Sequence, residues 1–416
     1  MLFLYNTGIY LYTLFIRIAS LKNKKAAAWI NGRKGLIPLI ESSLDKNKNY
    51  TWFHFASLGE FEQGRPVLER LKSENSELHI VITFFSPSGY EIRKNYALAD
   101  HVFYLPTDTS ANAKEFIRIL NPVMAIFTKY EYWYHYFDEL HKNNIPLYVI
   151  SGIFRKEQVF FKWYGGLHRK MLSKVSHFFV QNQNSSDLLN EIGFKNVTVN
   201  GDTRFDRVEY NATHTAGIKI ISDFTKENKI FIAGSTWPDD EKLLAKLAST
   251  FPDWKFIVAP HEVKPERINE ITEFFSNSIR YSDINNKLIE FEETQEISSN
   301  IQVLIIDNIG LLSSTYQYGD IAYIGGGFGV GIHNTLEAAA FGLPVIFGPN
   351  YQKFNEAVEL ISAGAAFTIK NQEELGKCME NLQTTSTREA CGKAALNYVK
   401  THTGATLAIL NFIGKI

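Results

Sequence analysis

From residue 51 onward, short apolar runs alternate with longer segments in which apolar residues recur every three or four positions. In the first half of the chain, the short runs predict strands at 51–56, 78–84, 102–105, 123–128, 147–151 and 177–181. Segments with helical spacing lie near 61–73, 87–96, 110–120, 133–143, 157–173 and 184–191. Nearly continuous apolar strands separated by helices are typical of a parallel sheet that helices cover on both faces. The first half is therefore expected to be an α/β domain with a doubly wound parallel sheet.

The alternation weakens around residues 201–219 and then begins again. Strands of the second half are expected at 229–234, 255–259, 303–306, 321–325 and 344–347. Helices are expected near 239–249, 265–275, 310–318, 334–341 and 354–362. A chain of 416 residues is too long for one ordinary core, so the length also favours two domains.

These patterns predict an N-terminal domain at 41–205 and a C-terminal domain at 206–390. The segment 388–413 has the spacing of one terminal helix, and residues 391–416 are expected to form a C-terminal helix that could pack back across both domains. Doubly wound sheets bind ligands outside the carboxyl ends of their strands. The polar residues that follow each predicted strand are therefore the first candidates for a functional site.

The N-terminal segment, residues 1–40, is apolar and basic. It begins MLFLYNTGIYLYTLFIRIAS, continues with LKNKK, and contains no acidic residue before Glu41. A signal peptide would carry its positive charge ahead of the apolar run, which is the reverse of the order here. Polar residues interrupt the run and make a membrane-spanning helix marginal. A helix in the membrane interface and a core helix of the first domain remain, and we favour a membrane anchor that contacts the membrane surface through residues 1–25.

The overall composition adds few constraints. With 43 basic and 44 acidic residues, the net charge of −1 gives no argument for nucleic-acid binding. The two cysteines form no C-x-x-C pair, and the histidines form no H-E-x-x-H motif. No D-x-D triplet is present to hold a metal with a diphosphate. The sequence therefore predicts neither a metal site nor a cofactor.

The densest chemical signal is DIAYIGGGFGVGIHNTLEAAAFGLPVIFGP, residues 320–349. A predicted strand runs into a cluster of glycines, and a helix is expected to open near 333–334. Glycines let the backbone approach a ligand closely, and a helix N-terminus offers free amide groups to a phosphate. The segment has no G-K-[ST] and comes late in its sheet, so it fits neither a P-loop nor a dinucleotide fingerprint.

The expected helix after the glycines carries an amide and a carboxylate three residues apart, on one face of its first turn. The carboxylate suits the hydroxyls of a ribose better than a phosphate. The alternative is a structural turn with a first-turn helix acid. The nucleotide-binding candidates are Gly326, Gly327, Gly331, Asn334 and Glu337.

Two other strand ends of the second half are also polar. AGSTWPDDE (233–241) places Ser235 and Thr236 at a helix start, and APHEVKPER (259–267) places His261 and Arg267 after a strand. Each residue alone is more often a helix cap or a solvated charge. Because these groups share the edge of one sheet with the glycine-rich turn, together they favour a phosphate-binding site.

In the first domain, HFASLGEFEQG (54–64) places the carboxylate of Glu60 directly after a predicted strand. Ser57 and Glu60 also fit S-x-x-E, the capping box in which both side chains bind backbone amides at a helix start. The end of a parallel strand is also where chemistry is performed in doubly wound domains. From this stretch alone, a capping role and a proton-transfer role both stay open.

Taken together, these residues resemble the family of 3-deoxy-D-manno-octulosonic acid (Kdo) transferases, which add Kdo to lipid A precursors. The most specific parts are the apolar basic N-terminus, S-x-G-E at 57–60, E-x-W at 131–133 and G-x-H-N-x-x-E at 331–337. TFFSPSGYE (83–91), GDTRFD (201–206) and LPVIFGP (343–349) support it. The resemblance implies the GT-B fold, with two Rossmann-like domains that face a central cleft. It also implies a CMP-Kdo donor, an acceptor of the lipid IVA type, and inverting transfer without a metal at the cytoplasmic face of the bacterial inner membrane.

By the same resemblance, Glu60 is the general base, Glu131 is a second carboxylate on the acceptor side, and Asn334 and Glu337 contact the cytidine nucleotide. The chain departs from the family at three places. The usual P-R-H reads Ala259-Pro260-His261, so that Arg267 partly substitutes for an arginine; the usual linker lysine is Arg204; and the usual N-x-R-x-S is SGIFR (151–155). The expected phosphate or acceptor contacts are Ser57, Gly59, Arg155 and Arg204.

Two other functions remain possible from the sequence. One is a different GT-B glycosyltransferase, or an epimerase of similar fold, that uses a UDP-sugar. The other is a nucleotide-binding protein that has lost catalysis. The basic apolar N-terminus favours a lipid-linked substrate over the first alternative, and the presence of both Glu60 and Glu131 counts against the second.

Overall fold

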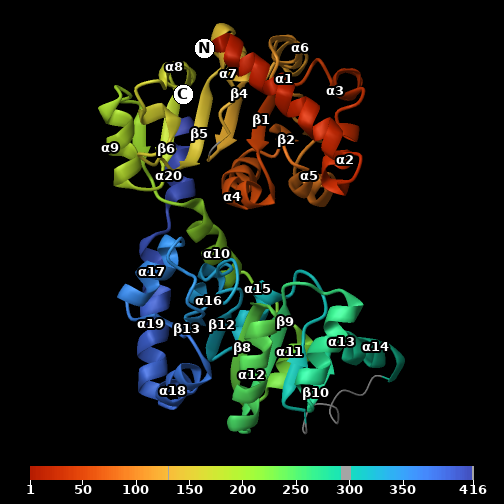
Figure 1. Ribbon diagram of the computed structural model, residues 1–416, viewed down its shortest axis with the longest axis vertical. Helices are drawn as coiled ribbons and strands as arrows, with labels where there is room; N and C mark the ends of the chain where they lie inside the picture. The colour runs from red at the N-terminus through yellow and green to blue at the C-terminus, as the bar shows by residue number, and fades with distance from the viewer. Residues whose placement is uncertain (130, 292–300, 415–416) are drawn as a thin grey trace. The chain divides into compact units, whose positions relative to one another are not determined.

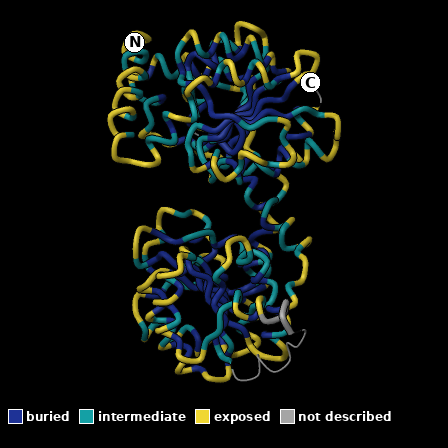
Figure 2. Tube along the Cα trace, turned by 90° about the vertical axis from the view of Figure 1, so that its right-hand side faces the viewer, coloured by how far each residue is buried: buried dark blue, intermediate teal, exposed yellow. Residues whose placement is uncertain are grey.

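The structure is a computed structural model that describes residues 1–129, 131–291 and 301–414. It divides into two compact units, Met1–Asp206 with Thr403–Ile416, and Arg207–His402 (Figure 1). Each unit contains a parallel sheet of seven strands, and buried residues concentrate in the strands (Figure 2). The predicted α/β class with two doubly wound sheets is confirmed.

The first unit has the strand order β3-β2-β1-β4-β5-β6-β7. Its strands are β1 (Tyr50–Phe55), β2 (His79–Phe84), β3 (His101–Tyr104), β4 (Met124–Thr128), β5 (Leu147–Gly152), β6 (His177–Val180) and β7 (Val197–Val199). Its helices include α4 (Leu58–Glu74), α5 (Pro87–Arg93), α6 (Ser110–Leu120), α7 (Tyr134–Lys142), α8 (Gly166–Leu172) and α9 (Gln183–Glu191). The winding direction reverses between β1 and β4, which makes their carboxyl ends the topological switch point where doubly wound sheets bind ligands.

Apolar residues cover both faces of this sheet. Trp52 and Val81 belong to one core cluster, and their chain neighbours Phe53 and Ile82 belong to the other. Alternate residues of a strand point to opposite faces, so an uninterrupted apolar run produces two cores. This explains why the strand pattern was legible in the sequence.

The second unit has the strand order β10-β11-β9-β8-β12-β13-β14. Its strands are β8 (Lys229–Thr236), β9 (Trp254–Pro260), β10 (Ser278–Arg280), β11 (Val303–Ile305), β12 (Ile321–Ile324), β13 (Val345–Phe347) and β14 (Ala366–Thr368). Its helices include α11 (Lys219–Thr225), α12 (Pro238–Thr250), α13 (Pro265–Phe274), α14 (Tyr281–Phe291), α17 (Asn355–Ser362) and α18 (Gln372–Gln383). Here the winding reverses between β8 and β12, so the polar ends of these two strands meet at the second switch point.

Several predicted helices are shorter than expected. The segment 157–173 contains only the 3-10 turn Val159–Phe161 and α8, because Gly165 packs with its α-carbon against the Val159 carbonyl, where a Cβ would lie 2.0 Å from the oxygen. The segment 310–318 contains α15 (Leu312–Thr315) and the 3-10 turn Tyr316–Tyr318. The helix expected at 334–341 is α16 (Leu336–Ala340), which begins two residues late. The strands β7, β10 and β14 were missed because each is a short strand at the edge of its sheet and lacks a continuous buried apolar run.

The expected single terminal helix at 388–413 is two helices, α19 (Thr385–Thr401) and α20 (Ala405–Ile413). The chain turns at Gly404, whose φ of 105° lies in the left-handed region that glycine tolerates. The Asp206 carboxylate accepts hydrogen bonds from the Gly404 and Thr406 amides at 2.6 and 2.7 Å and so caps the start of α20. The helix α19 belongs to the second unit, whereas α20 packs against α4 in the first.

Three helices precede the first sheet, α1 (Leu2–Ala19), α2 (Lys24–Asn31) and α3 (Leu36–Ser43). None of the α1 residues is buried, which excludes the core-helix interpretation. Half-buried residues recur at Tyr5, Ile9 and Ile16 in α1 and at Ser20 directly after it, and face the unit. The opposite side presents apolar side chains to solvent, with Phe3 78% and Phe15 65% exposed. By length and composition α1 could cross a membrane, a property that signal sequences share.

Candidate active site

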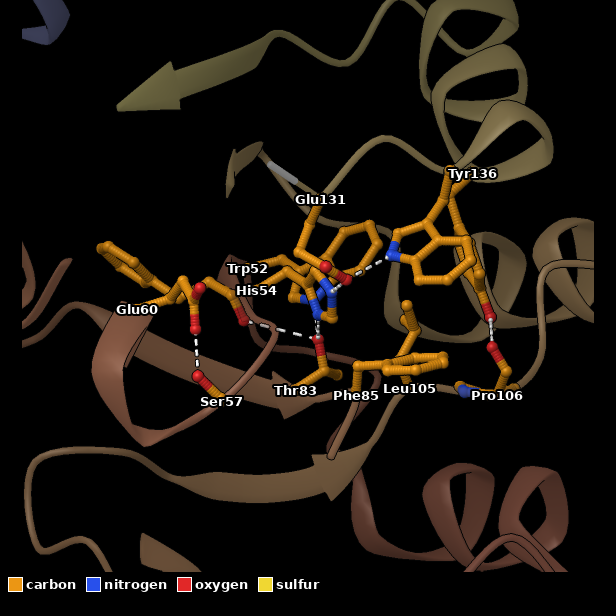
Figure 3. Close-up of polar contacts among 12 residues, drawn as sticks. Trp52, His54, Ser57, Glu60, Thr83, Phe85, Leu105, Pro106, Glu131 and Tyr136 are labelled. Carbon is orange, nitrogen blue, oxygen red and sulfur yellow. Dashed lines mark hydrogen bonds and ion pairs between the residues drawn. The ribbon is translucent and has the colours of Figure 1, made fainter. Parts of the chain in front are cut away.

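The loop between β1 and α4 holds Glu60 at the first switch point. Ser57 occupies the N-cap position of α4, but its side chain makes no capping hydrogen bond. Its hydroxyl donates to Oε2 of Glu60 instead (Figure 3). The capping box that S-x-x-E predicts is therefore not formed, because each side chain takes the other as its partner. The half-buried Glu60 carboxylate is left facing a hydroxyl rather than the backbone.

Glu131 follows β4, the neighbouring strand at the same switch point. Its Oε2 accepts from the indole Nε1 of Trp133 at 2.9 Å and lies 3.3 Å from Nε2 of His54. His54 lies in β1 and is fully buried. Figure 3 shows His54 between Glu131 and the Thr83 hydroxyl. The carboxylate is thus held by ring nitrogens on two sides.

The hydrogen bonds around His54 indicate which of its nitrogens carries the proton. Its Nδ1 lies 2.8 Å from the Thr83 hydroxyl, which also accepts from the indole Nε1 of Trp52 at 2.8 Å. If the hydroxyl donates to Nδ1, Nε2–H is free to donate to Glu131, and every group in the chain has one partner of the right kind. The arrangement therefore fits a His54 that carries a proton on Nε2.

The segment that carries Glu131 is also held from α1. The Tyr5 hydroxyl donates to the buried Asp108 at 2.5 Å, and Asp108 accepts from the amides of His135 and Tyr136 at 3.1 Å each. Burial raises the pKa of Asp108, and the hydroxyl and the two amides oppose that rise by stabilising its charged form. The side chain of His135 lies 2.7 Å from Asn6 on α1. The start of α7 is therefore tied to the N-terminal helix.

The other expected residues of the first unit lie apart from these bonds. Gly59 and Arg155 are exposed, Gly59 in the first turn of α4 and Arg155 after β5. Arg204 forms an ion pair with Asp202, its Nε lying 2.9 Å from Oδ2. Among the described residues, no hydrogen bond joins Glu60 to Glu131. The roles of these residues toward a ligand stay predictions.

In the second unit, the glycine-rich segment follows β12 at the switch point. A Cβ on Gly325 would lie 2.3 Å from the Ser235 carbonyl oxygen, and one on Gly327 would lie 2.6 Å from the Gly348 α-carbon. The first glycines are thus required by backbone packing against the ends of β8 and β13. Gly326 and Gly331 have φ values of 90° and 136°, which side chains rarely adopt.

A buried carboxylate organises this turn. Asp240 in α12 accepts from the Gly326 amide and the Trp237 amide at 2.9 Å each, and from the Tyr323 hydroxyl at 2.7 Å. Burial raises the pKa of Asp240, and these three donors counter that rise. Beside it lies a cavity of about 290 Å³ lined mainly by the start of α12 and by residues 326–330. The cavity offers glycine backbone and an aromatic wall to a ligand.

A stack of three rings borders the same turn. The Trp237 and His261 rings lie 4.9 Å apart, and the His261 and His333 rings lie 4.4 Å apart. The Trp237 indole donates to Nε2 of His333 at 3.1 Å. Burial, reinforced by His261, lowers the pKa of His333 to about 4. A stack of aromatic rings of this kind suits a nucleobase or a sugar face.

Some of the other residues that were expected to contact the donor nucleotide sugar are bound to protein groups instead. Arg267 forms an ion pair with Glu241, which is fully buried, and a second with Glu270 at 2.8 Å. Thr236 donates to the same Glu241 at 2.9 Å. Ser235, in contrast, is half-buried and has a φ of 54° at a β-strand end. A donor role for Arg267 stays a prediction, although the structure gives it a packing role that sequence reasoning missed.

Asn334 and Glu337 lie together at the start of α16. The Asn334 amide donates to the Glu337 carboxylate at 3.0 Å, and its oxygen accepts from the Leu336 amide at 3.1 Å. Asn334 therefore serves as a cap just ahead of the helix. Within the described ranges, the side chains of His, Cys, Asp and Glu form no group of three or more with metal-site geometry.

Sequence reasoning missed His54, Thr83 and Asp108. His54 and Thr83 are register partners in β1 and β2, and both are buried polar residues in otherwise apolar strands. That pairing was the available signal, because an isolated polar residue in a buried strand needs a partner. Asp108 gave no comparable signal, since its partners come from segments far away in the chain.

Comparison with known proteins identifies the relatives of this chain. Residues 30–207 match the family of 3-deoxy-D-manno-octulosonic-acid transferases (kdotransferases). The chain is 29% identical to a 3-deoxy-D-manno-octulosonic acid transferase of Aquifex aeolicus over 80% of its own length and 86% of that protein. It is 25% identical to the enzyme of the same name from Haemophilus influenzae, over 87% and 86% of the two lengths.

A solved structure supports the fold. The UDP-GlcNAc 2-epimerase of Neisseria meningitidis, bound to UDP-GlcNAc, aligns with a TM-score of 0.62 over 88% of this chain and 100% of that one, at 15% identity. The fold is GT-B, with two Rossmann-like units. The chain is thus similar in sequence to Kdo transferases over most of its length.

Proposed function

We propose that this Kdo transferase relative moves Kdo from CMP-Kdo to a lipid A precursor of the lipid IVA type, with inversion and without a metal, and with Glu60 as the general base. The observation that carries this proposal is the position and partnership of Glu60. It stands at the switch point of the first unit, and its hydrogen-bond partner is the Ser57 hydroxyl. Because no basic group among the described residues forms an ion pair with it, the carboxylate is available to accept a proton.

The chemistry asks for one base on the acceptor side. The acceptor oxygen attacks the anomeric carbon of Kdo, its proton passes to Glu60, and CMP leaves from the opposite face with the electrons of the broken carbon–oxygen bond. A positioned base of this kind typically contributes 10²–10⁴-fold to the rate. Ser57 holds the carboxylate in one orientation before the acceptor arrives.

We assign Glu131 to positioning the acceptor. Both hydrogen bonds that it accepts end on Oε2, and among the described residues none ends on Oε1. The second oxygen is therefore available to a sugar hydroxyl. The buried chain through His54 and Thr83 holds this carboxylate rigidly, which reduces the entropy lost on binding.

The second unit is assigned to the donor. Backbone amides of the glycine-rich turn and His261 would contact the leaving CMP phosphate, and Asn334 with Glu337 would contact the ribose. Preorganised amide donors stabilise a departing anion without reorganising during the reaction. The ring stack of Trp237, His261 and His333 supports this assignment, because it presents a flat surface beside the turn.

For location, we propose the cytoplasmic face of the bacterial inner membrane, with the exposed apolar side of α1 in the membrane surface. The large exposed fractions of its apolar side chains support this proposal. A lipid-linked acceptor would reach the first unit from that surface.

The proposal is tested by incubating the full chain with CMP-Kdo, with and without a lipid A precursor, in detergent micelles. CMP release should depend on the lipid, and the lipid should gain the mass of Kdo. CMP release that is independent of the lipid, or turnover of UDP-GlcNAc in place of CMP-Kdo, would contradict it. Mass measurement also counts the Kdo units added.

A further inference from the structure

A wide groove lies between α1 and the α2–α3 segment, and its floor is completed by residues that follow β3. Its volume is about 800 Å³. Arg17 enters it from α1, and Arg33 and Lys34 enter it from the turn before α3. Thr107 borders it from the β3–α6 connection, and Asn112 borders it from the first turn of α6. The groove belongs entirely to the first unit and is separate from the carboxylates at the switch point.

The charge of this groove is uncompensated. Its lining contains three cationic side chains and no carboxylate. In the described part of the chain, none of the three forms an ion pair. The neighbouring helix α6 shows the usual alternative, since its Arg118 pairs with Glu41 at 3.0 Å and with Glu115 at 2.7 Å. Cations gathered without counter-charges mark a site for an anion.

Arg33 forms a rigid floor for such an anion. Its guanidinium donates to the carbonyl oxygens of Leu105, Phe85 and Trp29 at 2.8–3.1 Å, and its central carbon lies 3.8 Å from the centre of the Trp29 ring. Burial lowers its pKa to about 9. A guanidinium has five N–H donors, so donors remain after these three bonds. Holding it without a carboxylate costs free energy that a bound anion would offset.

The setting of the groove indicates where the anion comes from. The lining residue Leu21 is 83% exposed, and the exposed Phe15 and Ile18 precede it on α1. A cationic groove bordered by solvent-exposed apolar side chains matches a molecule with a negative head and acyl chains. The volume also greatly exceeds that of a lone phosphate ion. Arg recognises phosphate through paired, charge-assisted hydrogen bonds.

We propose that this groove binds the phosphate of a membrane-lipid headgroup, with Arg33 as its floor and Arg17 and Lys34 at its mouth. The proposal rests on the proposed function only in that a lipid-linked acceptor brings the chain to a membrane. It adds a second polar anchor beside the apolar face of α1. The groove would then fix the orientation of the first unit on the lipid surface.

The test compares two double variants that remove the same charge from the same segment. R17Q with K34Q removes the two cations at the mouth of the groove and keeps Arg33. In contrast, K22Q with K25Q removes two exposed cations that lie outside the groove. Full-length proteins are titrated with phosphatidylcholine vesicles that contain either phosphatidic acid or oleate, adjusted to equal surface charge. We expect R17Q with K34Q to lose about tenfold of its affinity for phosphatidic acid vesicles and K22Q with K25Q to lose less. On oleate vesicles, the two variants should behave alike.

Equal losses for the two pairs on phosphatidic acid would overturn the proposal, because general attraction to an anionic surface is about the same for each basic residue. Inorganic phosphate at constant ionic strength provides a second arm. If it raises the melting temperature of the wild type but not of R17Q with K34Q, the site takes free phosphate and the lipid assignment is wrong. Vesicle binding needs no donor, so this test can fail while CMP-Kdo turnover persists, and the reverse.

Discussion

The two switch points use histidine and carboxylate in opposite ways. In the first unit, Nε2 of His54 lies beside the half-buried Glu131 and is placed to donate to it. In the second, Nε2 of His333 accepts from the indole of Trp237. The carboxylates Asp240 and Glu241 of the second unit are buried and satisfied by protein donors, whereas Glu60 of the first meets a single hydroxyl.

The difference separates two kinds of polar site on one architecture. A carboxylate that is fully paired and buried stabilises a turn and has little capacity left for a substrate. A half-buried carboxylate with a hydroxyl partner retains capacity to accept a proton. The first unit is therefore suited to acid–base chemistry. The second offers glycine backbone and rings, which are suited to holding a ligand.

The largest expected effect concerns Glu60. Replacing Glu60→Gln keeps the size and polarity of the side chain but removes its basicity, so transfer should fall by about 10²–10⁴-fold. Affinity for CMP-Kdo and the melting temperature should stay close to those of the wild type. The measurements are initial rates of lipid-dependent CMP release and calorimetric titration with CMP-Kdo.

The matched control is Glu74→Gln, which changes an exposed glutamate at the far end of the same helix α4. Its surface ion pair with Arg70 contributes about 0–1 kcal/mol, so neither rate nor stability should change much. If Glu60→Gln turns over at a near-normal rate, Glu60 is not the base. A loss of stability without a loss of rate would instead give it a structural role.

The second prediction concerns the buried ion pair between Arg267 and Glu241 in the second unit. Arg267→Gln leaves the fully buried Glu241 without its cation, which should cost about 3–5 kcal/mol of unfolding free energy. Because the chain has two units, hydrogen exchange of β8 and β9 amides is the suitable measurement. Lys264→Gln, which removes an exposed cation nearby, serves as control.

The result also decides whether Arg267 contacts the donor nucleotide sugar, as the sequence predicts. A variant with normal protection of β8 and β9 but weakened CMP binding would make Arg267 a ligand contact rather than a structural one. Weakened protection of β8 and β9 with normal CMP binding would mean that Arg267 does not replace the arginine of the P-R-H motif. Either outcome sharpens the contrast between satisfied and available charges.

How far the sequence could predict this molecule depended on how local each signal was. The nearly continuous apolar runs of β1, β2 and β8 were legible because each run by itself indicates burial on both faces. The edge strands β7, β10 and β14 were not legible, because they are only partly buried. The break at Gly404 was not legible either, because the capping contact there comes from the distant Asp206. Element type was therefore more predictable than helix ends.

The same limit applied to the sites. Glu60 and the glycine-rich turn were found because motif and strand end coincide within a few residues. The residues that bind the site side chains were not found. Thr83 contacts His54 from the neighbouring strand, and Tyr5 contacts Asp108 although the two are 103 positions apart in the chain. The capping box, one of the two roles that S-x-x-E left open, is not formed for a related reason. A capping box predicts backbone partners, and here the two side chains bond to each other.

The smallest expected effect is a pH dependence carried by the second unit. An ordinary histidine has a pKa near 6.5, whereas His333 is held at about 4 by burial and by His261. As the pH falls below about 6.5, His333 becomes protonated in the unfolded chain but stays unprotonated in the folded chain. The stability that His333 contributes is therefore complete above pH 6.5 and is lost progressively toward pH 4. Protonation would also remove the lone pair that accepts the Trp237 indole.

Replacing His333→Gln removes this titration while it keeps a polar side chain of similar reach. The melting temperature of the wild type should fall more steeply than that of His333→Gln between pH 6.5 and pH 4. The difference should be modest, because His333 is only partly buried and solvent screens its charge. His214→Gln, in the same unit at an exposed position, is the matched control and should retain the wild-type slope. Equal slopes for wild type and His333→Gln would show that the ring stack accommodates a proton, and would remove the distinction drawn between the two histidines.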